Sequence, residues 1–394
     1  MGTEKHLAQW PQHRREGSWI TDESGRSVLA WHVSGGVFNL GFGNEAVARA
    51  VADVVTTHDA GYWSMRSQRR DDAERAFHRL LPDDLDRTFF TPSASEAFEV
   101  GCKLAKRRTG RPGLVSVTGG YYGAVGYALA MDDPLLQPER YAPLAGPVPK
   151  AEFGSIESLE ALVDETTAAV CIEAVQVPAG VIEAPAGYLR DVQALCAERG
   201  ALLLLDEVQG GLFRTGDAWA FEAHDVVPDL LVTGKGLGGG YYPIGALSMP
   251  NPSFEVFGEL PPLHRSSFCG NEIGAEVASR VAAIYLEEGI GDEVRRKGAL
   301  LRAGLEVIVA DHPETLVELR GRGLLYGIDA ASVEVAAAIA VAAWQNDLYV
   351  NRLVRQECIT IMPTLVTTDE ELQTGLERFA GAVDTIARGR QPDR

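Results

Sequence analysis

The central part of the chain, from about residue 87 to residue 249, alternates short apolar runs with stretches of helical period. The runs predict strands at RTFF (87–90), GLVSV (113–117), AAVCIEAV (168–175), ALLLLDEV (201–208), DLLVTG (229–234) and GALSM (245–249). A helix is expected after Ser95, and another ends at Gly200. The run 201–208 is apolar on both faces, which is typical of a central parallel strand covered by helices. The pattern predicts an α/β unit with its ligand site at the carboxyl ends of the strands.

The pattern changes after about residue 271. The expected elements are long helices at 271–288 and 292–311, a strand-like stretch at 316–330, short strands around 349–353 and 358–363, and a final helix from Asp369. A chain of 394 residues is too long for one compact core. We therefore expect a large domain with a mostly parallel sheet at 56–285 and a smaller α+β domain at 286–394. Residues 1–55 are expected to pack with the small domain, which is then built from both termini.

The charge balance bears on the partners of the protein. The formal net charge is −19, with 36 Lys and Arg against 55 Asp and Glu, so a nucleic acid is excluded as a natural partner and a small-molecule substrate is favoured. The first residues hold no apolar core of signal-peptide length, and the apolar stretch 333–344 is too short to span a membrane. We expect a cytoplasmic protein without a membrane partner.

The cysteines are scattered without CxxC spacing. We expect each of them to be buried and reduced as a small hydrophobe, and we predict no metal site; the five are Cys102, Cys171, Cys196, Cys269 and Cys358.

Two charged residues stand at the ends of apolar strands. Asp206 ends the run 201–205, where a buried carboxylate needs a cation or a donor. Lys235 follows the strand 229–234 among glycines, which let the backbone approach a ligand closely. Alone, Lys235 could be a side chain that reaches the surface. With Asp206, it indicates a desolvated amine for Schiff-base chemistry, with the carboxylate holding a pyridine nitrogen protonated.

A small-residue turn, Ser93-Ala94-Ser95, lies between the strand 87–90 and the helix that follows it. Ser93 and Glu96 have the spacing of a capping box, which alone explains the serines. The free N–H groups and hydroxyls of such a helix start also bind phosphate.

Five separated motifs resemble those of the class III (ω-type) aminotransferases of fold-type I, in the family's order and over nearly the whole chain. The motifs are TPSASEAFE (91–99), GGYYGAVG (119–126), LLLLDEVQGGLFRTG (202–216), VTGKGLGGGYYPIGA (232–246) and LHRSSFCGNE (263–272). The resemblance implies a homodimeric aminotransferase that depends on pyridoxal 5′-phosphate and shares its active sites between subunits.

The resemblance also implies residue roles. Lys235 would hold the cofactor as a Schiff base and shuttle a proton, and Asp206 would pair with the pyridinium nitrogen. The other implied contacts are Val208 and Tyr121 on the two ring faces, Gln209 at the phenolic oxygen, Ser93, Ala94 and Ser95 around the phosphate, Glu173 at the family's E-P position, and Ser267 reaching the partner's phosphate. Tyr121 and Glu173 could instead be structural, and for Arg214 a structural ion pair is expected.

The chain departs from the family pattern at several positions. Pro92, Ala94 and Phe98 replace Asn, Gly and Asn, Tyr122 replaces His, and Ala174 replaces the Pro of E-P. A Glu and an Arg that form a switchable carboxylate clamp in glutamate-using members are replaced by Pro178 and Thr360. Joint loss is coherent, because loss of one partner alone leaves an unpaired buried charge. Three cations lie in the neighbouring sequence and are expected to be solvated surface residues: Arg66, Arg352 and Arg355.

Two other functions stay open at this point. The same cofactor and fold also serve decarboxylases, epimerases or racemases and aminomutases, which fold and cofactor motifs barely separate from aminotransferases. A non-catalytic binding protein that kept the fold is the third reading, and the presence of both Lys235 and Asp206 speaks against it.

Overall fold

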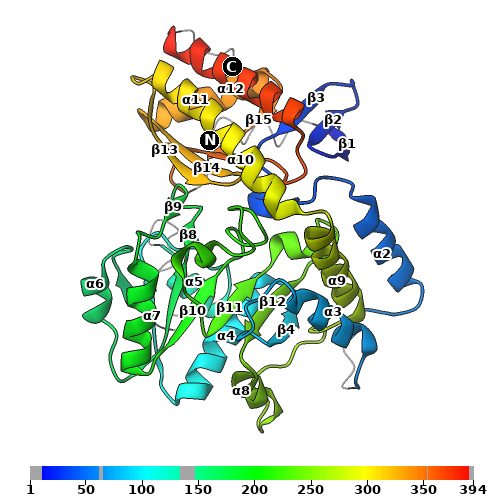
Figure 1. Ribbon diagram of the computed structural model, residues 1–394, viewed down its shortest axis with the longest axis vertical. Coiled ribbons are helices and arrows are strands. Elements are labelled where there is room, and N and C mark those ends of the chain that lie inside the picture. The colour runs from blue at the N-terminus through cyan, green and yellow to red at the C-terminus, as the bar shows by residue number, and fades with distance from the viewer. Residues whose placement is uncertain (1–10, 62–64, 134–145, 147, 353, 390–394) are drawn as a thin grey trace.

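The computed structural model describes residues 11–61, 65–133, 146, 148–352 and 354–389. A large unit built around one sheet lies below a smaller mixed unit (Figure 1). The strands of the large sheet, in chain order, are β4 Arg87–Thr91, β5 Gly113–Val117, β6 Lys150–Ala151, β7 Thr167–Glu173, β10 Leu202–Asp206, β11 Leu230–Thr233 and β12 Gly245–Met249.

The large sheet has the strand order β4-β12-β11-β10-β7-β5-β6. Strand β12 is antiparallel to both of its neighbours, whereas the pairs from β11 to β6 are parallel. The α/β prediction and its six strands are confirmed. The prediction missed β6, which is only two residues long and carries no periodic pattern.

Helices α4 (Ala94–Thr109) and α7 (Tyr188–Arg199) cover opposite faces of this sheet. Successive side chains of β10 alternate between them: Leu203 and Leu205 belong to the apolar cluster that includes α7, and Leu204 to the cluster that includes α4. Helix α7 ends at Gly200 in the left-handed region, at φ 68°, as the sequence predicted. Burial on both faces explains why β10 reads as a continuous apolar run.

Further helices and one hairpin surround this core. They are α2 Glu45–Val55, α3 Gln68–His78, α5 Gly126–Met131, α6 Ile156–Glu160, α8 Asn251–Phe254, α9 Glu272–Glu287 and the hairpin β8 Val175–Gln176 with β9 Ile182–Glu183. Helices α2 and α3 both pack against α9. The strand expected over 168–175 stops at Glu173, and Val175 already belongs to the hairpin.

The smaller unit holds an antiparallel sheet in the order β13-β14-β17-β16. Its elements are α10 Ile290–Asp311, β13 Leu316–Arg322, β14 Leu325–Ala330, α11 Val333–Gln345, β16 Asn351–Arg352, β17 Cys358–Ile361 and α12 Asp369–Ala387. Within the described part of the chain, no helix is long and apolar enough to cross a membrane.

The two ends of the chain meet in a third sheet, of order β1-β2-β3-β15. Its strands are β1 Gln12–Glu16, β2 Trp19–Asp22, β3 Ser27–Ala30 and β15 Leu348–Tyr349. Strand β3 runs parallel to β15, and His32 bridges to Met362 just beyond β17. The domain boundaries at residues 55 and 285 stay a prediction.

Candidate functional site

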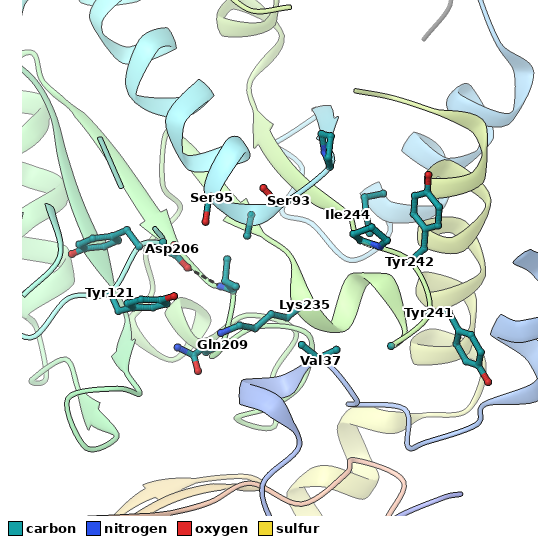
Figure 2. A pocket seen from close by; sticks show the side chains of 17 residues that line it. Val37, Ser93, Ser95, Tyr121, Asp206, Gln209, Lys235, Tyr241, Tyr242 and Ile244 are labelled. Atoms are coloured by element: carbon teal, nitrogen blue, oxygen red, sulfur yellow. Dashed lines mark hydrogen bonds between the residues drawn. The ribbon is translucent and has the colours of Figure 1, made fainter. Parts of the chain in front are cut away.

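A cavity of about 450 Å³ lies at the carboxyl ends of β10 and β11 (Figure 2). All of the predicted cofactor contacts except Glu173 and Ser267 line it: Ser93, Ala94, Ser95, Tyr121, Asp206, Val208, Gln209 and Lys235. They come from four segments that are distant in sequence and follow β4, β5, β10 and β11, and the sheet brings these segments to one edge.

Lys235 follows β11 after Gly234 and opens a 3-10 turn, Lys235–Gly238. Its backbone is in the left-handed region, at φ 45°, which costs a non-glycine residue roughly 1–3 kcal/mol. Burial lowers the pKa of the Lys235 amine from 10.5 to about 8, against the opposing fields of Asp206 and Glu173. The side chain extends toward Gln209 and Tyr121 across the cavity (Figure 2). Such an amine is partly neutral at physiological pH and can act as a nucleophile.

Asp206 ends β10 directly beside Glu173 of β7, with which it is in register. The Val208 N–H donates to Asp206 Oδ1 at 2.9 Å, a bond drawn in Figure 2. Burial raises the pKa of Asp206 to about 7, against the lowering effects of that hydrogen bond and of Lys235. Burial and the adjacent Asp206 raise the pKa of Glu173 well above its usual range. Two neighbouring buried carboxyls thus favour a cationic group in the cavity.

Tyr121 connects Glu173 to the cavity. Its backbone N–H donates to Glu173 Oε2 at 2.9 Å, so Glu173 lies behind the cavity wall and fixes the Tyr121 loop. Burial also raises the pKa of the Tyr121 phenol, which therefore stays neutral. Glu173 acts here through Tyr121 and does not itself line the cavity.

The small-residue turn before α4 is packed so closely that its neighbours must be glycines. A Cβ at Gly245 would lie 2.5 Å from the Ser93 carbonyl, and a Cβ at Gly123 would overlap Ser95 Oγ. Ser93, Ala94 and Ser95 line the cavity from one side at the start of α4, which suits a phosphate at a helix N-terminus.

The predicted capping box is only half formed. Ser93 Oγ accepts the Glu96 N–H at 3.2 Å, as a cap should. The Glu96 carboxylate does not return to the Ser93 amide, because it accepts a hydrogen bond from His264 Nε2 at 2.8 Å. Local spacing could not reveal that competition, since His264 lies far away along the chain.

Gly35 is a site residue that the sequence analysis missed. A Cβ there would lie 2.8 Å from Gln209 Oε1 and 3.1 Å from Lys235 Nζ, at a φ of 62°. The turn at Gly35 therefore packs directly against the Lys235 side chain, and only glycine fits at residue 35. The pair Gly35–Gly36 predicts a turn, but the sequence does not show which distant loops this turn contacts.

Ser267 lies apart from the other predicted contacts within one chain. It is exposed and lines a separate cavity of about 1010 Å³ beside Phe89, Phe257 and His264. Its role at a partner's phosphate stays a prediction.

One position of the missing carboxylate clamp, Pro178, borders a third cavity of about 260 Å³, which shares Tyr121 with the first. Pro178 and Arg355 line it, and the Arg355 N–H donates to the Pro178 carbonyl at 3.1 Å. Thr360 is buried, and its Oγ1 has no hydrogen-bond partner within the described structure.

Two expectations for arginines need correction. Arg355 is not a free surface residue, because it is partly buried and paired with Asp329 at 2.7 Å. Arg214 is structural but forms no ion pair with a described residue: its guanidinium donates to the carbonyls of Leu324 and Pro363 and to Asn39. Arg66 is exposed and paired with Asp71, as a surface residue should be.

The comparisons with known proteins agree with this geometry. The family model "Aminotransferase class-III" matches residues 2–383. The acetylornithine aminotransferase of Methanopyrus kandleri is 33% identical over 373 residues, which are 93% of this chain and 92% of that protein. The putrescine aminotransferase of Pectobacterium atrosepticum is 31% identical over 95% of this chain and 82% of its own. The ornithine aminotransferase structure from Toxoplasma gondii matches at a TM-score of 0.90, with 23% identity over 99% of this chain and 95% of that one.

Proposed function

The chain belongs to the class-III aminotransferase family, and from that premise we propose that the cavity at Lys235 binds pyridoxal 5′-phosphate and moves an amino group between a small amine or amino acid and a carbonyl acceptor. One observation carries the proposal: a desolvated amine and a buried carboxylate face the same cavity from the ends of neighbouring strands. The turn at Ser93–Ser95, against which glycines pack, would bind the phosphate through hydroxyl and amide groups at the start of a helix.

The residues would divide the work as follows. Lys235 would hold the cofactor through its amine and, once released, would carry a proton at Nζ between two carbon atoms. Asp206 would hold a proton on the pyridine nitrogen. When bound, the cofactor supplies an electron-withdrawing ring that accepts the electron pair left by the departing proton. Val208 and Tyr121 would keep the ring between them, and Gln209 would donate to its phenolic oxygen.

The decisive experiment separates transamination from the other reactions of this cofactor. The holoenzyme is incubated with single amines and amino acids, without an acceptor. We expect stoichiometric release of a carbonyl product while the amino group stays on the enzyme. Release of carbon dioxide, or loss of substrate chirality without a carbonyl product, would contradict the proposal.

The pH dependence of cofactor capture follows from the lowered pKa of Lys235. The neutral amine is the nucleophile, so capture of pyridoxal phosphate by the cofactor-free protein should accelerate with rising pH and level off above about 8. Stopped-flow absorbance measures the rate, with a free lysine derivative as reference. A midpoint near 10.5, as in the reference, would show that the site does not desolvate this amine.

Assembly is the next prediction. If Ser267 reaches the phosphate bound by a second copy, the enzyme is a homodimer, and dilution into monomers should release the cofactor. Loss of one such hydrogen bond in Ser267→Ala should weaken cofactor affinity by about two- to tenfold. Sedimentation velocity with detection at the cofactor's absorbance tests both statements. A monomer that retains full cofactor would refute the shared site.

Glutamate and 2-oxoglutarate should be poor substrates. An Arg–carboxylate pair contributes roughly 1.5–3 kcal/mol, so its absence at Pro178 and Thr360 should cost about ten- to a hundredfold in affinity. The preferred donor lacks a carboxylate at that position or is held differently. Steady-state kinetics with glutamate and with a neutral amine compare the two classes. Strong saturable activity with glutamate would refute the inference, and Arg355→Ala would then test whether Arg355 replaces the clamp.

A cytoplasmic location is also proposed. The five cysteines are free and buried, as expected for a protein of a reducing compartment.

A further inference from the structure

Three side chains of different chemistry meet on the far side of the phosphate turn. Glu96 lies in the first turn of α4, whereas His264 and Cys269 belong to one loop before α9. His264 Nε2 is 2.8 Å from Glu96 Oε1, and Cys269 Sγ is 3.6 Å from the same oxygen. One donor atom from each residue lies within 4.8 Å of the others.

This combination of donors suits a borderline metal ion. Imidazole nitrogen, thiolate sulfur and carboxylate oxygen are the ligands of zinc, at about 2.0–2.3 Å from the ion. In a tetrahedron of such bonds the ligand atoms stand about 3.2–3.6 Å apart. Two of the spacings in the cluster, 2.8 and 3.6 Å from Glu96 Oε1, are close to these values, and the third is at most 4.8 Å, so side-chain adjustments could bring all three donors onto one ion. The cluster differs from an ordinary acidic patch because two of its three donors are not carboxylates.

The cluster is both enclosed and reachable. Cys269 is 4% exposed, and the side chains of His264 and Glu96 are 12% and 23% exposed. His264 and Cys269 also line the cavity of about 1010 Å³. That cavity leaves room beside the cluster for a solvent molecule as the fourth ligand, which is the arrangement of an open zinc site. Ser267 lines the same cavity, so in the proposed homodimer the ion would lie close to the partner subunit.

We propose that Glu96, His264 and Cys269 bind one zinc(II) ion, or a transition-metal ion of similar preference. The ion replaces the hydrogen bonds from His264 and Cys269 to Glu96, and the Cys269 thiol releases its proton to solvent on binding. It ties the loop 264–269 to the first turn of α4. This site lies outside the cavity at Lys235 and does not depend on the transaminase activity.

The test uses metal-free holoenzyme in zinc-buffered solutions, with bound zinc measured by elemental analysis after dialysis. We expect one ion per chain. Since loss of outer-shell partners alone costs 10–100-fold in metal affinity, loss of a ligand in Cys269→Ala should weaken binding by at least about a hundredfold. The matched control is Cys196→Ala, which removes another buried thiol on α7 and should bind like the wild type.

Cadmium-113 resonance of the loaded protein gives an independent readout, because its shift reports a sulfur ligand. His264→Gln and Cys269→Ser provide conservative variants if the alanine forms fold poorly. Wild-type protein that binds zinc no more tightly than Cys269→Ala, or a cadmium signal without sulfur coordination, would overturn the proposal. These outcomes are independent of whether the enzyme transaminates.

Discussion

Replacing Lys235 with alanine is expected to abolish turnover while leaving the fold intact. The substitution removes both the amine that would hold the cofactor and the base that would move the proton. Proton transfer by a positioned base alone contributes about 10²–10⁴-fold, so the total loss should exceed that range. The backbone at 235 keeps its left-handed φ of 45° in the variant, and this cost is already present in the native protein.

Borohydride treatment of the wild-type holoenzyme measures the covalent link directly. The reduced cofactor should be recovered on the peptide that contains Lys235. Lys103→Ala is the matched control, because Lys103 lies on α4 outside the cavity and is paired with Glu99 at 3.8 Å. That variant should keep wild-type turnover and labelling. Label on another lysine, or persistent turnover in Lys235→Ala, would overturn the assignment.

Substitution of Asp206 by asparagine should lower turnover by at least about 10²–10³-fold without removing the cofactor. A neutral amide cannot hold the pyridine nitrogen protonated, so the ring becomes a weaker electron acceptor. The effect should fall on kcat, because Asp206 would act on the reacting electrons, whereas the residues proposed to bind the phosphate are unchanged. Steady-state kinetics, with cofactor content measured in parallel, separate these contributions.

Glu207 offers a matched control one residue away. Its buried carboxyl accepts the amides of Ala220 and Phe221 at 3.1 and 3.0 Å and does not line the cavity. Burial raises the pKa of Glu207 to about 8. Because both of its oxygens accept backbone amides, glutamine keeps only one of the two hydrogen bonds, and the cost should fall on stability. Glu207→Gln should retain kcat. Similar kcat losses in both variants would indicate a structural role for Asp206 instead.

The sequence predicts those features that depend on the apolar pattern of a strand and on the residues that directly follow it. The doubly buried run at 202–205 predicted a central strand, and the strand ends then predicted that Asp206 and Lys235 would meet, because parallel strands end at one edge. The turn at Ser93 could also be predicted, because a strand ends and a helix begins within a few residues of it.

The features that were missed depend on contacts between distant segments. Gly35 packs against Lys235, and the Glu96 carboxylate is hydrogen-bonded to His264. Both contacts join loops that are far apart in the sequence, so no local pattern predicts them. An ion pair is expected for Arg214, but its guanidinium donates to two backbone carbonyls and to Asn39 from other parts of the chain. Ser267 cannot be judged from a single chain, because its proposed partner belongs to another copy.

The sheet that joins both chain ends has a consequence for biosynthesis. Strand β3, which leads into the turn at Gly35, pairs with β15 near residue 348, and His32 bridges to Met362. During translation the ribosome releases the Lys235 loop long before it releases these partners. The turn at Gly35 therefore cannot be held against Lys235 by these partners until synthesis has passed residue 362. A nascent or truncated chain can form its central sheet early, but the cavity at Lys235 is complete only once residue 362 has left the ribosome and the third sheet has formed.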